Sequence, residues 1–185
     1  MNKALKQTLF GLGAAAALGA VAVGYFVYEQ LHPDLPRNLS ALGQVPLTNE
    51  AGSSLHLSEA VTPHSATLVA FWATWCGPCH SEATKIAALR RQYRADDLSI
   101  LYLNVDEAPS AAATAAFLRA SHAENLHVLY AGHSGWKAIT GHSTMALPRS
   151  YVFDRAGTAS AVFAGFDKSD TGAEMQHSLI KAITG

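Results

Sequence analysis

Hydrophobic and polar positions divide the chain into one long uncharged segment near its start and a body of shorter apolar runs. Residues 8–28 carry no charged side chain, whereas Lys3 and Lys6 precede them and Glu29 follows. At about 1.5 Å per residue, a helix over this segment spans about 30 Å, the thickness of a bilayer core. Because Lys residues favour the cytoplasmic side, the pattern predicts one transmembrane helix within an N-terminal anchor, residues 1–30. The rest of the chain is then exported.

A cleaved signal peptide is the alternative for the same segment. The tripeptide Ala20-Val21-Ala22 has the small-x-small form of a cleavage site. The apolar region of a signal peptide runs about 7–15 residues, which is shorter than residues 8–28 and favours the uncleaved anchor. Both interpretations place the body of the chain outside the cytoplasm. The anchor places it in the periplasm, tethered to the inner (cytoplasmic) membrane by a single pass.

The body of the chain alternates between apolar runs of strand length and helical patterns. Residues 31–41 contain Pro33 and Pro36 and are predicted to form a tether, which leaves residues 42–185 as the folded domain. The run 67–72 is almost entirely apolar, which is typical of a strand buried on both faces. The complete prediction is a hairpin over 44–57, strands over 67–72, 98–105, 126–130, 150–154 and 160–164, and helices over 77–94, 110–120, 136–139 and 170–183.

The order of these elements predicts an α/β fold. Strands and helices alternate after the first hairpin, which favours a parallel core. The last two strands flank Arg155-Ala156-Gly157-Thr158, a plausible hairpin turn, and they add antiparallel strands. We therefore expect a mixed sheet with helices on both faces. Ser110 is the expected N-cap of the helix that follows it.

Composition and charge exclude two broad classes of protein. Hydrophobic residues make up 49% of the chain and charged residues 15%, so the chain can bury a core and is not intrinsically disordered. The 13 Lys and Arg residues nearly balance the 14 Asp and Glu residues, giving a formal net charge of −1. This balance excludes the broad electropositive surface on which nucleic-acid binding depends.

The candidate chemistry lies in the only two cysteines, Cys76 and Cys79, within Trp75-Cys76-Gly77-Pro78-Cys79. This sequence directly follows a predicted buried strand and opens a predicted helix. The helix dipole favours a thiolate at its N-terminus, so we expect Cys76 to have the lowered pKa and the exposed sulfur. Cys79, one turn further on, is then the buried thiol that attacks Cys76 in a mixed disulfide. Pro78 suits a first helical turn because its missing N–H is not needed there.

Two structural roles for the cysteine pair are less favourable. A structural zinc site needs four ligands, and beyond this pair and the adjacent His80 the remaining histidines are scattered along the chain. A purely structural disulfide across so short a loop constrains the unfolded chain very little. The pattern favours a redox-active pair, with no metal.

The string Phe71-Trp72-Ala73-Thr74-Trp75-Cys76-Gly77-Pro78-Cys79 resembles the active-site signature of the thioredoxin superfamily. Together with the anchor, it is similar to the membrane-tethered TlpA/ResA-like thiol-disulfide oxidoreductases. The resemblance extends from about Leu42 to the C-terminus. It implies a thioredoxin-like sheet with an N-terminal β-hairpin and a central strand-helix insertion, here residues 108–125. It also implies that the Cys76–Cys79 disulfide is the redox group and that no cofactor is needed.

The resemblance also implies roles for residues outside the cysteine motif. The segment 146–154 matches the cis-proline loop, which places Pro148 in cis beside Cys76 and pairs the backbone of Leu147 with an extended substrate peptide. Glu82 matches a glutamate found near the thiols and is the candidate proton acceptor, the alternative being a solvated Glu on a helix face. Trp75 is expected to be an exposed shoulder of the site. His80 either tunes a thiol pKa or is a surface histidine.

Some positions depart from the pattern of related proteins. The buried Asp of cytoplasmic thioredoxins is replaced by Ala70, so any such role falls to Glu82. The segment 144–147 does not resemble the loop of cytochrome c maturation proteins, and Arg149 replaces its acidic residue. These differences argue against a role in haem maturation.

The resemblance implies a protein-disulfide reductase. The Gly77-Pro78 spacer is that of thioredoxin, which suggests a reducing potential. The expected partners are exported client proteins with disulfides and a transmembrane thiol electron donor, and no nucleic acid. A disulfide oxidase or isomerase, a copper-delivery protein of the metallochaperone type and a peroxidase relative stay open as alternatives. The last is the weakest, because peroxidases do not carry this Cys-x-x-Cys pair after a Trp.

Overall fold

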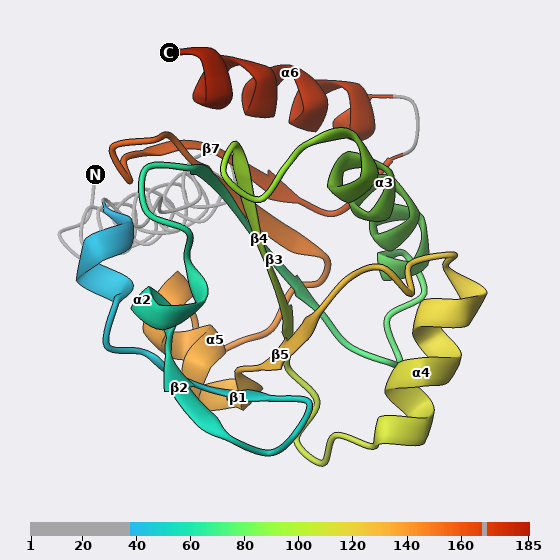
Figure 1. Cartoon of the computed structure of the whole chain (residues 1–185). Coiled ribbons are helices and arrows are strands. Elements are labelled where there is room, and N and C mark those ends of the chain that lie inside the picture. The colour runs from blue at the N-terminus through green and yellow to red at the C-terminus, as the bar shows by residue number, and fades with distance from the viewer. Residues whose placement is uncertain (1–37, 168–169) are drawn as a thin grey trace, which may run out of the picture. The chain divides into compact units, whose positions relative to one another are not determined.

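The computed structural model describes residues 38–167 and 170–185, and in this part of the chain seven strands form one mixed sheet in the order β2-β1-β5-β4-β3-β6-β7 (Figure 1). The strands are β1 (Pro46–Asn49), β2 (Ser54–His56), β3 (Ala66–Trp72), β4 (Leu98–Asn104), β5 (Val128–Tyr130), β6 (Arg149–Phe153) and β7 (Ala159–Ala164). The helices are η1 (Leu39–Leu42), α2 (Leu57–Ala60), α3 (Cys79–Gln92), α4 (Ala111–Ala120), α5 (Gly132–Thr140) and α6 (Thr171–Thr184).

The centre of the sheet is parallel and its two sides are antiparallel. β3 pairs in parallel with β4, and β4 in parallel with β5. β6 runs antiparallel to β3, and β7 antiparallel to β6. The β1–β2 hairpin joins the other side through an antiparallel pairing of β1 with β5. The predicted mixed α/β sheet of thioredoxin-like type is confirmed.

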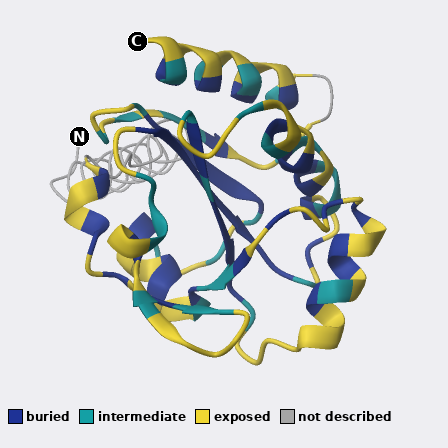
Figure 2. Cartoon of the chain, in the orientation of Figure 1, coloured by how far each residue is buried: buried dark blue, intermediate teal, exposed yellow. Residues whose placement is uncertain are grey.

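The core lies around β3, which is buried at every position (Figure 2). Because successive side chains of a strand point to opposite faces of the sheet, Trp72 packs against the helices on one face and Phe71 against those on the other. Trp72 contacts Phe117 of α4 with ring centroids 4.4 Å apart, whereas Phe71 meets Trp136 of α5 edge-on at 5.2 Å. α4 therefore covers one face of the sheet and α5 the other, and α3 lies beside α4, where His80 stacks on Phe117.

The C-terminal helix α6 lies on the same face as α3. The Lys85 ammonium of α3 donates a hydrogen bond to Gln176 of α6 at 2.7 Å.

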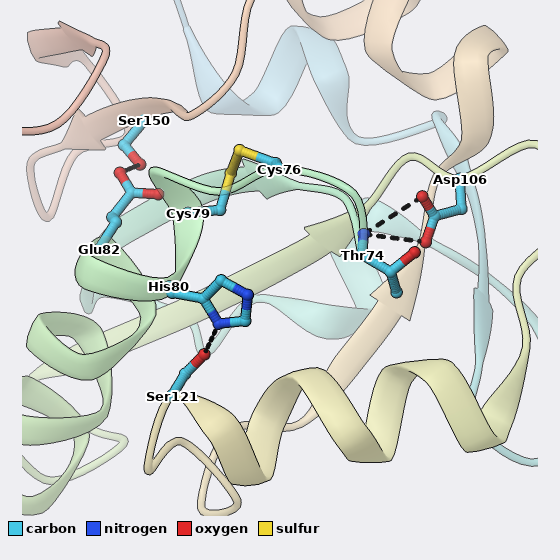
Figure 3. Close-up of a disulfide and its surroundings, with 8 residues drawn as sticks. All are labelled: Thr74, Cys76, Cys79, His80, Glu82, Asp106, Ser121 and Ser150. Atoms are coloured by element: carbon cyan, nitrogen blue, oxygen red, sulfur yellow. Dashed lines mark hydrogen bonds between the residues drawn. A yellow bond between two sulfur atoms is a disulfide. The ribbon is translucent and has the colours of Figure 1, made fainter.

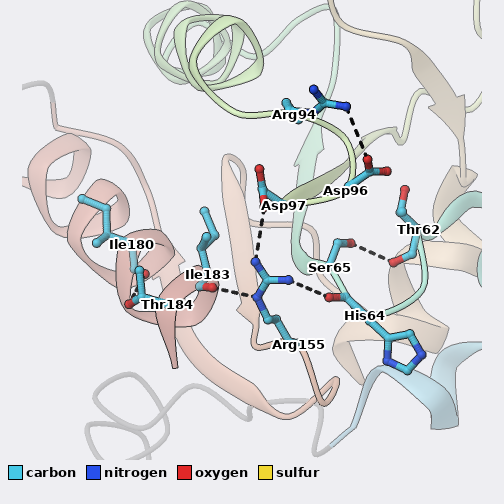
Figure 4. A network of polar contacts seen from close by, with 10 residues as sticks. All are labelled: Thr62, His64, Ser65, Arg94, Asp96, Asp97, Arg155, Ile180, Ile183 and Thr184. Carbon is cyan, nitrogen blue, oxygen red and sulfur yellow. Dashed lines mark hydrogen bonds and ion pairs between the residues drawn. The ribbon is translucent and has the colours of Figure 1, made fainter.

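Arg155, in the turn between β6 and β7, connects elements at the end of the sheet where β3 and β4 begin (Figure 4). Its guanidinium donates to the carbonyls of Ile183 and His64 and to the carboxylate of Asp97. This network joins α6 to the starts of β3 and β4, at the end of the sheet opposite the cysteines.

The main departures from the predicted elements concern the α4 insertion, α5 and α2. The segment 108–125 holds α4 but no strand, and the strand of that insertion is β5, further along the chain. α5 begins at Gly132, four residues before the expected start at 136. The first turn was missed because its two glycines weaken the helical pattern in the sequence. The short helix α2 was not predicted. Ser110 does cap α4, since its hydroxyl accepts a hydrogen bond from the Ala113 amide.

The folded domain already includes the last residues of the predicted tether, 31–41. Leu39 and Leu42 of η1 are buried, and the Leu39 amide donates to the Gly157 carbonyl at 2.8 Å. The Asn38 side chain caps η1 by accepting from the Ser40 amide. Leu39 and Leu42 lie at helical spacing, but the prolines and polar residues around them make this pattern hard to recognise in the sequence.

No helix within residues 38–167 and 170–185 combines the length and the apolar character needed to cross a membrane. The predicted anchor, residues 1–30 with its transmembrane segment 8–28, lies outside the described residues.

Candidate active site

Cys76 and Cys79 form a disulfide where the chain passes from the end of β3 into the start of α3 (Figure 3). Two turns shape this passage: the Cys76 amide donates to the Ala73 carbonyl at 3.1 Å, and the Cys79 amide to the Cys76 carbonyl at 3.2 Å. Pro78 is the last residue before α3 and already has helical dihedral angles, as its fixed φ allows. The disulfide therefore closes directly onto the N-terminus of a helix of 14 residues.

Both cysteines are buried, and they differ slightly in exposure. Cys76 retains 4% exposure, whereas Cys79, the first residue of α3, is fully buried. Next to Cys76, the Trp75 side chain is 65% exposed, and Gly77 and Pro78 are exposed as well. Cys76 therefore borders a patch of exposed residues, although it is itself buried. The expectation of an exposed Cys76 is therefore wrong for the disulfide form, and the order of roles of the two cysteines stays a prediction.

The loop before the cysteines is held by a carboxylate that the sequence analysis missed. Both Asp106 oxygens accept from the Thr74 amide, at 3.2 and 3.3 Å. Asn104, fully buried at the end of β4, donates its side-chain amide to Asp106 and accepts from the Asp106 backbone amide, each at 3.0 Å. The available signal was a polar pair at the end of a buried strand parallel to β3, because the ends of such strands meet at one sheet edge.

The Leu147–Pro148 peptide bond is cis, as the resemblance implies. Pro148 is buried and leads directly into β6, whose first residue Arg149 pairs with Phe71 near the end of β3. Leu147 is half-buried, just before that strand. The proline loop and the cysteine loop therefore meet at the same end of the sheet.

Glu82 is fully buried, so the alternative of a solvated helix-face carboxylate is excluded. It lies one turn after Cys79 on α3, on the same side of the helix. The Ser150 hydroxyl of β6 donates to Glu82 Oε1 at 2.7 Å, while Oε2 has no hydrogen-bond partner (Figure 3). Burial raises the pKa of Glu82 to about 8, and the hydrogen bond from Ser150 opposes that rise.

Tyr102 of β4 completes the buried surroundings of this carboxyl group. Its ring stacks on Trp72 with centroids 4.9 Å apart, and its hydroxyl is buried without a hydrogen-bond partner. Burial, and then the charge of Glu82, raise the pKa of Tyr102 well above its ordinary value. Tyr102 and Ser150 were not found from the sequence, because both reach Glu82 only through sheet pairing.

His80 is neither free on the surface nor part of a metal cluster. Its Nδ1 lies 2.7 Å from the Ser121 hydroxyl, and its ring stacks on Phe117 with centroids 4.1 Å apart. Within the described part of the chain, no group of three or more His, Cys, Asp and Glu side chains is placed to hold a metal ion.

The two departures from the family pattern lie on opposite faces of the sheet: Ala70 pairs with Tyr102 and Ser150, on the side of Glu82, whereas Arg149 is on the other side. Ala70 is fully buried in β3 and supplies no carboxylate. Arg149 is 7% exposed, and its Nε donates to the Tyr151 hydroxyl at 2.6 Å. Because neighbouring strand residues alternate between faces, Arg149 points to the opposite side of the sheet from Ser150 and Glu82.

Comparison with known proteins gives one family match that covers most of the chain. The family described as Redoxin matches residues 33–179. Among curated proteins, a thioredoxin-like protein of Synechocystis is 50% identical over 46 residues, which are 25% of this chain and 41% of that protein. The segments matched in the first three curated relatives span 41%, 53% and 41% of their own lengths.

Two solved structures show the same fold at low identity. One, from Chlorobium tepidum, carries the provisional name thiol:disulfide interchange protein DsbE and is 22% identical, with a TM-score of 0.65 over 81% of this chain and 99% of that one. The other is a secreted Mycobacterium tuberculosis disulfide oxidoreductase homologous to E. coli DsbE, 14% identical, with a TM-score of 0.58 over 75% of this chain and 96% of that one.

Proposed function

Because this chain belongs to the Redoxin family and folds like a thioredoxin, we propose that it is a thiol-disulfide oxidoreductase that reduces disulfides of exported proteins. The observation that carries the proposal is the Cys76–Cys79 disulfide at the N-terminus of α3, next to the cis-proline loop. The pair itself is the redox group. Leu147 and Pro148 form the edge along which the client's extended backbone lies.

In the first step, the Cys76 thiolate attacks one sulfur of the client disulfide. The client's second sulfur leaves as a thiolate and takes up a proton, and a mixed disulfide joins the client to Cys76. The dipole of α3 stabilises the attacking thiolate, because the positive end of the helix faces it. The greater exposure of Cys76 relative to Cys79 supports this assignment of the attacking sulfur.

In the second step, Cys79 must lose its proton before it attacks the Cys76 sulfur. A Cys thiol ordinarily has a pKa of about 8.5, and burial raises the pKa of Glu82 to about 8. Because its pKa is raised toward the range of a thiol, Glu82 accepts the Cys79 proton at less thermodynamic cost than a carboxylate of ordinary pKa, which favours base catalysis. The Cys79 thiolate then displaces the client's remaining sulfur, leaving the client reduced by two electrons and the chain oxidised.

The direction of electron flow and the cellular location extend this proposal. We place the domain in the periplasm, held by a single membrane pass over residues 8–28. The Gly77-Pro78 spacer, which is that of thioredoxin, supports the reducing direction. A reductant outside the cytoplasm needs electrons carried across the membrane, so a transmembrane thiol carrier is the proposed donor.

The reduction potential of the Cys76–Cys79 pair in the full chain tests the direction. We expect a value closer to that of thioredoxin, about −270 mV, than to the strong oxidant DsbA, about −120 mV. A potential near the latter would assign the chain as a disulfide oxidase. Stoichiometric Cu(I) binding by the reduced pair, without disulfide reduction, would instead assign a copper-delivery role.

A further inference from the structure

A hollow of about 470 Å³ opens between the cysteine loop and α4. We call it the α4 hollow, and its walls include Trp75, His80, Ala113, Ala116, Phe117 and Ala120. Trp75 directly precedes Cys76 and His80 directly follows Cys79, so the hollow adjoins the reactive disulfide on the side of the α4 insertion. A polypeptide joined to Cys76 therefore has this hollow within reach.

The walls of the α4 hollow are mainly apolar, with Thr74 and His80 as their polar residues, and carry no Asp, Glu, Lys or Arg. Ala113, Ala116 and Ala120 are exposed and lie three or four residues apart, so their short side chains form one open strip along α4. Trp75 is one of two large hydrophobic side chains exposed among the described residues, the other being Ile180 on α6. An exposed ring beside a reactive disulfide is suited to contact with another apolar group.

The hydrogen bonds around His80 fix which ring nitrogen is available to a ligand. The Ser121 hydroxyl donates its one proton to the Phe117 carbonyl at 2.8 Å. In the tautomer consistent with that donation, the Ser121 oxygen accepts from His80 Nδ1 at 2.7 Å and Nε2 is the acceptor nitrogen of the ring. Nε2 keeps its lone pair, on the side of the ring turned away from Ser121 (Figure 3). Stacking on Phe117 holds the ring in this orientation.

We propose that the α4 hollow binds the client segment next to its reactive cysteine: an uncharged, apolar client side chain packs between Trp75 and the alanines of α4, and a client backbone N–H donates to His80 Nε2. This inference rests on the proposed disulfide reduction. The absence of charge in the walls selects against acidic or basic residues at that client position, because a charge there loses water without gaining a partner.

Variants that fill the hollow test the proposal in the full chain, held in detergent micelles. The substrates are a peptide disulfide with Leu beside its cysteine, the same peptide with Asp there, and the small disulfide of 2-mercaptoethanol. Ala116→Leu and, as a second filling variant, Ala113→Leu should raise KM for the Leu peptide about tenfold. Both should leave reduction of the small disulfide unchanged. The matched control Ala112→Leu, exposed on α4 but outside the hollow, should change neither.

The role of His80 is tested by His80→Phe, which keeps a ring for stacking on Phe117 but removes the acceptor. It should raise KM for the Leu peptide severalfold, as expected for one lost hydrogen bond, with kcat unchanged. Equal KM values for the Leu and Asp peptides, or filling variants that behave like Ala112→Leu, would overturn the inference while the small disulfide is still reduced. A wild-type chain that reduces none of the three disulfides would instead contradict the proposed function.

Discussion

At the scale of single residues, the proposed resolving step uses Glu82 as the proton acceptor, and with a pKa of about 8 only about one molecule in ten holds it in the ionised, accepting form at pH 7. Glu82→Gln removes the base and retains the shape of the side chain. We expect release of the mixed disulfide to slow about 10²-fold at pH 7, within the range of general-base contributions. The difference in release rate between Glu82→Gln and the wild type should shrink above about pH 8.5, where a thiol of ordinary pKa ionises without a neighbouring base. Stopped-flow measurement of single-turnover release between pH 6 and 10 checks this.

Two further variants separate base catalysis from general damage to the fold. Ser150→Ala removes the hydrogen bond that lowers the Glu82 pKa, so the pH at which release becomes fast should move up, and Ser150→Thr should restore it. Glu174→Gln, at an exposed position on α6, should have no effect. A Glu82→Gln profile that coincides with the wild type would show that Glu82 takes no part in proton transfer.

Residues differ in how far the sequence could assign them. Cys76 and Cys79 were identified because two cysteines in one short motif are a local signal. Glu82 was singled out only through resemblance, since a Glu on a helix says nothing of its burial. Ser150 and Tyr102 carried no signal, because β6 and β4 bring them to Glu82 from positions distant in sequence.

At the scale of elements, the strand that carries the cysteine loop was well predicted, whereas two helices and the contact that holds this loop were not. A continuous apolar run identified β3, because a strand buried on both faces needs no polar alternation. α5 and α2 were mispredicted or missed, as glycines and short length weaken a helical pattern. The contact of Asp106 with the cysteine loop depends on the register between β3 and β4.

Asp106→Ala should loosen the loop between β3 and α3. The substitution leaves the Thr74 amide and the NH2 group of the buried Asn104 side chain without their acceptor, which costs about 1–3 kcal/mol of unfolding free energy. Urea denaturation of the oxidised chain measures this loss. Asp96→Ala is the matched control, because Asp96 is exposed in a long ion pair of 3.8 Å and should contribute little. Equal losses in the two variants would contradict the role of Asp106.

At the scale of the whole molecule, Glu82 should make stability depend on pH. Its pKa is about 8 in the folded chain and 4.5 in the unfolded one, so between these values the folded state holds a proton that the unfolded state has lost. The free energy of unfolding should therefore fall as pH rises through this window, by at most about 1.4 kcal/mol per unit, and level off above it. Denaturation at pH 5, 7 and 9 should show this fall in the wild type and its absence in Glu82→Gln. A parallel fall in both would assign it to other groups.

The anchor predicted over residues 8–28 concerns the whole molecule as well. We expect the mature protein to stay in the membrane fraction after a carbonate wash, since a helix of about 20 apolar residues inserts stably. Detergent should release it. Recovery in the soluble fraction, with a mature N-terminus near Val23, would show that the segment is a cleaved signal peptide.

The central claim is that Cys76 attacks the client and Cys79 resolves the mixed disulfide. The direct measurement is to express the full-length Cys79→Ser and Cys76→Ser variants, block free thiols with an alkylating agent, and map intermolecular disulfides by mass spectrometry. Cys79→Ser should accumulate exported proteins bound through Cys76, released by reductant, because the resolving thiol is absent. Cys76→Ser should accumulate almost none, since Cys79 is buried. Equal trapping through Cys79, or no trapping by either variant, would contradict the account.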